Sequence, residues 1–332
     1  MNRLVITKIY VLLALGFGGL LFYGSAIASC GTISCSLNSS WDEFDPSQHG
    51  WGWDVRLSHN RADTLRAGSK KIVADLADEE VENLHTVNNI ISTTIDYAID
   101  ERKGISLYVP YLMRDHSHSV GDGSGILTGK VETFKARALG DVKVIGRYRW
   151  TWNVIENSNI GVKLGLKLNT GRKNIQWEAG GVPSEVSLQP GNGSTDIIFA
   201  GFWQRSPSNS SWNHFAQTSL QHSINSSPAF KPGKQINLDV GSRYFFNHDL
   251  SGLLQLNAQW NSTDTGLTAP LSPITGAASS GGRIYSITPG LSYALAREVQ
   301  LYSLIQIPVY QHVNGEQLTS KAVFSLGMTR RF

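Results

Sequence analysis

Basic side chains recur at even spacing in two nearby stretches of the chain. Residues an even number of positions apart on a β-strand point to the same face of it. If both stretches are neighbouring strands, the basic residues form one positively charged wall, which would attract anions. In the alternative interpretation, acidic residues such as Asp196 and Asp239 neutralise the wall in a structural ladder, because buried charges are usually paired. The five basic residues are Lys143, Arg147, Arg149, Lys163 and Lys167.

Histidines and cysteines are the other side chains that could bind a ligand. His116 and His118 alternate in a polar segment downstream of His85, and imidazoles bind Cu, Ni or Zn. In the simpler interpretation these three histidines are solvated in loops, so we predict no metal and no other cofactor. Cys30 and Cys35 are predicted to form a disulfide after export, unless Cys30 carries a lipid anchor instead.

Several classes of function are disfavoured. No serine lies in a Gly-x-Ser-x-Gly setting and no other catalytic set is recognisable, so an enzyme is not predicted. Removal of a leader up to residue 28 takes Arg3 and Lys8 from the 29 basic residues and leaves 27 against 26 acidic ones. A net charge this close to zero provides no footprint for nucleic acid.

The beginning of the chain resembles a secretory signal. Arg3 and Lys8 precede an apolar core from Ile9 to Tyr23, and a small-residue cleavage pattern follows at residues 26–28. We therefore predict three parts: a signal peptide at 1–28, a periplasmic lead-in at 29–50, and one membrane domain at 51–332.

From Trp51 onward, apolar and polar residues alternate in segments of strand length. In residues 159–169, Val162, Leu164 and Leu166 fall on one face and Lys163 and Lys167 on the other, a pattern that a helix would mix. Such alternation is typical of a strand with one face toward lipid and one toward a lumen. The predicted strands are 51–60, 86–99, 104–113, 140–153, 159–169, 194–205, 212–224, 235–247, 250–263, 282–295, 298–311 and 321–332.

The connections between these strands alternate strictly between short and long. This alternation is typical of outer-membrane barrels, which have tight turns on the periplasmic side and longer loops on the external side. The chain has 33 glycines, only 17% charged residues and 10% aromatic residues, which also fits a barrel. We therefore predict an all-β protein, a transmembrane antiparallel up-and-down β-barrel of about 12 strands in the bacterial outer membrane, in contact with membrane lipid. The six long connections are 61–85, 114–139, 170–193, 225–234, 264–281 and 312–320.

Aromatic residues mark the predicted strand ends. Indole rings settle at the level of lipid headgroups, and seven tryptophans are placed to do so. The chain ends on Phe332, after Phe324, Leu326 and Met328 at every second position, so Phe332 is predicted to engage the outer-membrane assembly machinery. The seven tryptophans are Trp51, Trp53, Trp150, Trp152, Trp203, Trp212 and Trp260.

Short motifs in the last 60% of the chain, in this order, resemble the outer-membrane transporter-like barrels related to the meta-pathway phenol-degradation proteins. The motifs are residues 139–142, 165–171, 188–191 with Gly193, 289–291, and 327–332. Asn169 stands where that family tends to carry proline. The resemblance implies a barrel of undefined cargo and brings no catalytic residues with it.

Glycine-rich, polar and charged inward faces suit water better than a packed core. We therefore expect a porin or transporter-like channel for small solutes, with a preference for anions. The alternative is a structural or partner-binding outer-membrane barrel without a conductive pore. Neither the solute nor the oligomeric state follows from the sequence.

Overall fold

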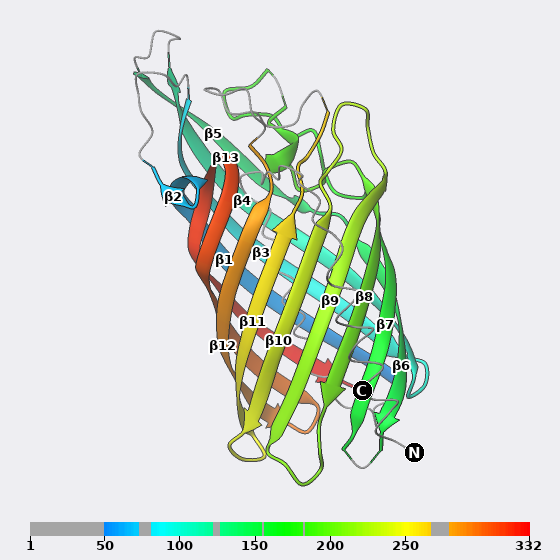
Figure 1. The fold of residues 1–332 in the computed structure, drawn as a ribbon. Coiled ribbons are helices and arrows are strands. Elements are labelled where there is room, and N and C mark those ends of the chain that lie inside the picture. The colour runs from blue at the N-terminus through cyan, green and yellow to red at the C-terminus, as the bar shows by residue number, and fades with distance from the viewer. Residues whose placement is uncertain (1–49, 73–80, 122–126, 155, 182, 267–278) are drawn as a thin grey trace, which may run out of the picture.

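A computed structural model describes residues 50–72, 81–121, 127–154, 156–181, 183–266 and 279–332. The predicted signal peptide, nearly all of the lead-in, and Cys30 and Cys35 lie outside these residues. The described chain forms one antiparallel sheet that closes on itself (Figure 1). Its strands are β1 (Gly50–Gly68), β2 (Lys70–Lys71), β3 (Val81–Ala98), β4 (Lys103–Gly121), β5 (Leu127–Leu139), β6 (Lys143–Asn153), β7 (Ser158–Lys167), β8 (Thr195–Arg205), β9 (Trp212–Asn225), β10 (Gln235–Phe245), β11 (Leu250–Asn261), β12 (Gly282–Ala296) and β13 (Val299–Arg331).

The strands occupy about twelve positions around the barrel, and two features of the pairing produce this number. β5 pairs with the upper half of β4 and β6 with its lower half, so together they occupy one position. β13 pairs with β12 through residues 299–313 and with β1 through residues 313–331, which closes the barrel. A hydrogen bond from Gln311 Nε2 to the carbonyl of Ser320, at 3.0 Å, joins the two halves of β13 across the reversal at Gly315. The predicted closed antiparallel barrel is confirmed.

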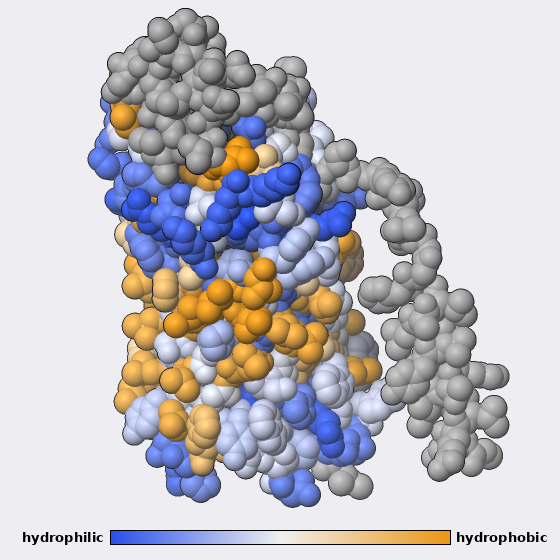
Figure 2. Space-filling view, turned by 60° about the vertical axis from the view of Figure 1, so that its left-hand side comes forward, coloured by the Kyte–Doolittle hydropathy of each residue, from blue (hydrophilic) through white to orange (hydrophobic). Residues whose placement is uncertain are grey.

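The outer surface carries an apolar band. On β7, Val162, Leu164 and Leu166 are exposed, while Lys163 and Lys167 between them are buried. The same alternation runs around the wall, and Figure 2 shows the hydrophobic residues gathered between more hydrophilic zones. Exposed apolar side chains are stable only against lipid, so polar residues lie inside and apolar residues outside.

Two of the predicted long loops are strands instead. Within the predicted connection 114–139, residues 114–121 form the upper part of β4 and residues 127–139 form β5, and residues 312–320 lie within β13. Outward-facing Asp115 and Arg137 form an ion pair at 3.0 Å on this β4–β5 extension, and such a pair stands above the hydrocarbon. The alternation is reversed on β5, where Phe134 and Ala136 are buried on the inner face and Lys135 and Arg137 are exposed on the outer one.

Other boundaries also differ from the prediction, and β3 begins at Val81, five residues before its predicted start. β1 continues to Gly68, eight residues beyond its predicted end, because its extension pairs with β13. The strand predicted from residue 140 begins at Lys143 instead, since residues 140–142 break the wall between β5 and β6.

Aromatic side chains gather near the end of the barrel that carries the short connections, which we call the turn end. Trp51, Trp150, Trp152 and Trp212 are all exposed there. The carbonyl of Trp51 accepts a hydrogen bond from the amide of Phe332 at 2.9 Å. No helix among the described residues is long and apolar enough to cross a membrane. Recognition of Phe332 by the assembly machinery remains a prediction.

The long connections should face the cell exterior, because porin-type barrels keep their tight turns in the periplasm. Single cysteines at Asn174, in the connection between β7 and β8, and at Ser208, in a short turn, test this in a chain whose native cysteines are replaced. A membrane-impermeant maleimide should label Asn174→Cys on intact cells, while Ser208→Cys should react only after permeabilisation. Labelling of Ser208→Cys from outside would reverse the assigned orientation.

Candidate functional site

The five predicted basic residues share the inward face of β6 and β7. Lys143 lies opposite Lys167 and Arg147 opposite Lys163 in the register of the two strands. Opposite residues on paired strands point to the same side of the sheet. The exposed Val162, Leu164 and Leu166 point to the opposite, outer side. The five basic side chains therefore face the barrel interior. Their surroundings nevertheless differ from one residue to the next.

Lys167 is neutralised by two carboxylates. Its Nζ lies 2.9 Å from Asp141 Oδ2 and 3.2 Å from Asp196 Oδ2, and it donates to Asn192 Oδ1 and Ser194 Oγ at 2.6 and 3.0 Å. Both carboxylates and the lysine are buried. Asp141 reaches Lys167 because the barrel sheet is interrupted between β5 and β6, just before Lys143. The Oδ1 of Asp141 also accepts a hydrogen bond from the amide of Gly171 at 2.9 Å. Lys167 therefore belongs to a structural network.

Lys143 and Lys163 meet amide and aromatic groups. Lys143 Nζ donates to Gln221 Oε1 at 3.3 Å and lies 5.7 Å from the centre of the Tyr108 ring. Lys163 Nζ donates to Gln217 Oε1 at 3.3 Å and lies 5.4 Å from the Phe202 ring centre. Sequence reasoning did not single out these glutamines, although their alternation along β9 identifies them as inward-facing.

The two arginines lie closer to the turn end. Arg149 Nε donates to the carbonyl of Glu101 at 3.0 Å, which ties β6 to the turn between β3 and β4. The Nε of Arg147 is buried and meets no hydrogen-bond partner in the described part of the chain. The predicted neutraliser Asp239 bonds to a neutral amide instead, since its Oδ1 accepts Asn257 Nδ2 at 2.6 Å. Of the two acids named from the sequence, Asp196 is the one that contacts the basic wall.

A second charged network, missed from the sequence, lies on β1 and β13. The hydroxyl of Tyr302 donates to Asp54 Oδ2 at 2.7 Å and accepts from Arg56 Nε at 3.0 Å. Gly327 leaves room for this ring, because a Cβ there would lie 2.3 Å from it. Tyr302 is distant in sequence from Asp54 and Arg56 and meets them only after the barrel has closed.

The connection between β7 and β8 folds onto the inner face of the β4–β5 extension. Leu188 and Phe134 are fully buried against each other, with Trp177 packed beside them. Arg114 on β4 donates to the carbonyl of Ser187 at 3.0 Å. The connection is therefore anchored over the interior side of the wall, at the end opposite the turns.

The histidine candidates separate into a pair and a single residue. His116 and His118 both face inward beneath Trp177, whose ring centre lies 4.6 Å from that of His118. Burial lowers the pKa of His116 to about 3. His85 lies opposite Ser117 in the register, on the other strand face, and its Nδ1 is 3.0 Å from Ser117 Oγ. Within the described ranges, no three His, Cys, Asp or Glu side chains converge to hold a metal ion.

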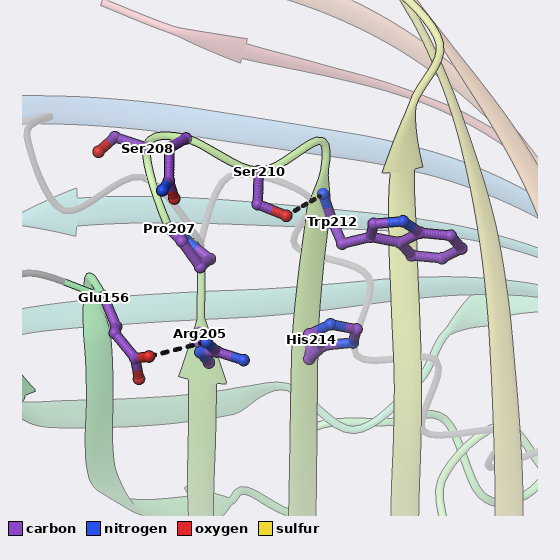
Figure 3. Close-up of a pocket in the computed structure, with 8 residues that line it drawn as sticks. Glu156, Arg205, Pro207, Ser208, Ser210, Trp212 and His214 are labelled. Atoms are coloured by element: carbon purple, nitrogen blue, oxygen red, sulfur yellow. Dashed lines mark hydrogen bonds and ion pairs between the residues drawn. The ribbon is translucent and has the colours of Figure 1, made fainter.

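A hollow of about 390 Å³ lies at the turn end, outside the lumen (Figure 3). Arg205, Trp212 and His214, which line it, stand on the lipid-facing sides of β8 and β9. Arg205 Nη2 pairs with Glu156 Oε1 at 2.8 Å, as the dashed line in Figure 3 marks. This hollow belongs to the outer rim of the barrel and not to its interior.

Known structures share the fold but little sequence. An outer membrane channel from Pseudomonas putida F1 is 13% identical, with a TM-score of 0.60 over 88% of this chain and 98% of that one. A Pseudomonas aeruginosa FadL homologue is 9% identical, with a TM-score of 0.46 over 85% and 90%. The CymD monoaromatic hydrocarbon channel is 9% identical, with a TM-score of 0.43 over 93% of this chain and 98% of that one.

Neither a protein-family model nor a curated protein matches the sequence. The link to the phenol-degradation proteins therefore remains an expectation from short motifs. The closed barrel, its apolar outer band and its likeness to an outer membrane channel together make this chain a β-barrel of the bacterial outer membrane.

Proposed function

We propose that the protein is a channel for small solutes and that its interior prefers anions. The supporting observation is a charge imbalance on β6 and β7. Five basic side chains face inward there, and the two carboxylates beside them, Asp141 and Asp196, both contact Lys167. The remaining basic charge is directed at the lumen.

Lys143 and Lys163 are the residues that set the preference in this proposal. Each ammonium group donates a hydrogen bond to a glutamine amide, and a neutral amide orients a positive charge. In a confined aqueous path, fixed positive charges raise the local concentration of anions. The fold likeness to an outer membrane channel agrees with transport and does not identify a solute.

The test is the reversal potential of the reconstituted protein in a salt gradient across a planar bilayer. We expect anion selectivity that fades with salt, because the screening length falls from about 10 Å at 0.1 M to about 3 Å at 1 M. The double variant Lys143→Gln with Lys163→Gln should lose most of that selectivity. Substitutions in a lumen alter selectivity more than folding.

Lys135→Gln is the matched control. Lys135 is exposed on β5 and pairs with Glu178 at 2.9 Å, outside the interior, so its loss should leave the reversal potential unchanged. A wild-type channel that is non-selective at low salt would contradict the anion preference while leaving transport intact.

A structural or partner-binding barrel without a conductive pore is the second candidate. The buried side chains of Phe215, Leu253, Tyr302 and Leu304 form an apolar cluster on the inner side of the wall, which favours a partly filled interior. Bilayer recordings separate the candidates, because this second one predicts no single-channel steps from folded protein.

A further inference from the structure

We propose that His116 and His118 form a binding site for a divalent transition-metal ion such as Cu(II) or Zn(II) at the loop-bearing end of the barrel. The two residues alternate on β4, so their side chains share its inward face. His116 Nε2 and His118 Nδ1 lie 3.4 Å apart. Two imidazole nitrogens bound to one metal ion at about 2.0–2.1 Å in tetrahedral geometry are separated by about 3.3 Å. The pair is already spaced as two ligands of one ion.

In each histidine, the ring nitrogen that points away from the other histidine lies near an oxygen; we call it the outer nitrogen. His116 Nδ1 lies 2.8 Å from Thr86 Oγ1, and His118 Nε2 lies 3.7 Å from Glu132 Oε2. Metal-bound histidines usually donate their second N–H to such an oxygen, which orients the ring. When both outer nitrogens carry the proton, the two inner lone pairs face each other at 3.4 Å. That arrangement is repulsive until a proton or a metal cation lies between them.

Charged side chains of both signs surround the pair. Glu132 Oε2 lies 3.7 Å from His118 Nε2, and the charges of Glu132 and Glu185 both act on His118. Carboxylates at this range attract a bound cation. Arg114 and His85 are the opposing basic groups that act on His116, and Arg114 Nε donates to Asn88 Oδ1 at 2.5 Å.

Two protein ligands make a site of moderate strength. We expect dissociation constants on the order of micromolar, with Cu(II) bound more tightly than Zn(II) as the general order of metal affinities requires. Water would complete the coordination. Because the site lies above the hydrocarbon and away from Lys143 and Lys163, the proposal is independent of the proposed anion channel.

The test is a titration of the folded, full-length protein in detergent with CuCl₂. Trp177 packs on both rings, with ring centres 6.0 and 4.6 Å away, so bound Cu(II) should quench it. We expect saturable binding of one equivalent, nitrogen hyperfine structure from two imidazoles in the electron paramagnetic resonance spectrum, and displacement of the copper by excess Zn(II). Trp177→Phe should lose this quenching and keep the copper spectrum.

His116→Asn and His118→Asn should each weaken copper binding at least about tenfold, which is about 1.4 kcal/mol. His248→Asn, in the exposed turn between β10 and β11, is the matched control and should bind copper as the wild type does. Unchanged affinity in both pair variants, or no saturable binding by the wild type, would overturn the site. If His116→Asn does not fold, His118→Asn and the zinc competition on unaltered protein still decide it.

Discussion

Replacing Lys167 with methionine should destabilise the folded barrel by about 3–5 kcal/mol, because it removes the ammonium group that contacts two buried carboxylates. Asp141 and Asp196 both contact this ammonium group. Lys143→Met, on the opposite residue of β6, should cost about 1 kcal/mol, since it removes a hydrogen bond to a neutral amide. Urea unfolding in lipid vesicles measures both free energies.

A second substitution tests whether the effect is electrostatic. Adding Asp196→Asn to the Lys167→Met chain removes one of the stranded charges, so part of the lost stability should return. Equal losses for Lys167→Met and Lys143→Met would show that the two lysines have the same role. The division of the basic wall into structural and lumen-facing members would then be wrong.

Gly191→Val should release the connection between β7 and β8 from the wall and raise the channel conductance. A Cβ at Gly191 would lie 2.6 Å from the carbonyl carbon and oxygen of Gly171, so the two backbones cannot keep their contact. Overpacking of this kind costs about 1–3 kcal/mol, and here the connection is the part most free to move. Single-channel conductance and limited proteolysis near Asn174 measure the release.

Gly201→Val on β8 is the matched control. A Cβ at that position would meet its nearest neighbour only at 4.0 Å, so neither conductance nor cleavage should change. If Gly191→Val makes the connection sensitive to protease and conductance stays at the wild-type value, the connection does not restrict the solute path.

The alternation of side chains was sufficient to predict the barrel and the inward face of the basic wall. A strand has a period of two, so Val162 and Leu164 on one face require Lys163 and Lys167 on the other. This relation is local, and it needs no knowledge of the neighbouring strands. The β4–β5 hairpin above the membrane was missed, because its outer face is polar and its buried apolar residues, such as Phe134, face inward.

Tertiary structure decided which of the predicted residues could act together. Lys143 and Lys167 are equivalent in the sequence pattern, but the break before β6 and the register with β8 bring Asp141 and Asp196 into ion-pair contact with Lys167. In the same way, the sequence predicts His116 and His118 in a connection, whereas the extended β4 places both on its inward face. Thr86 Oγ1 then lies 2.8 Å from His116 and Glu132 Oε2 3.7 Å from His118. A strand's own period determines where its side chains point, whereas charge pairing and ligand geometry depend on groups that only chain closure brings within a few ångströms.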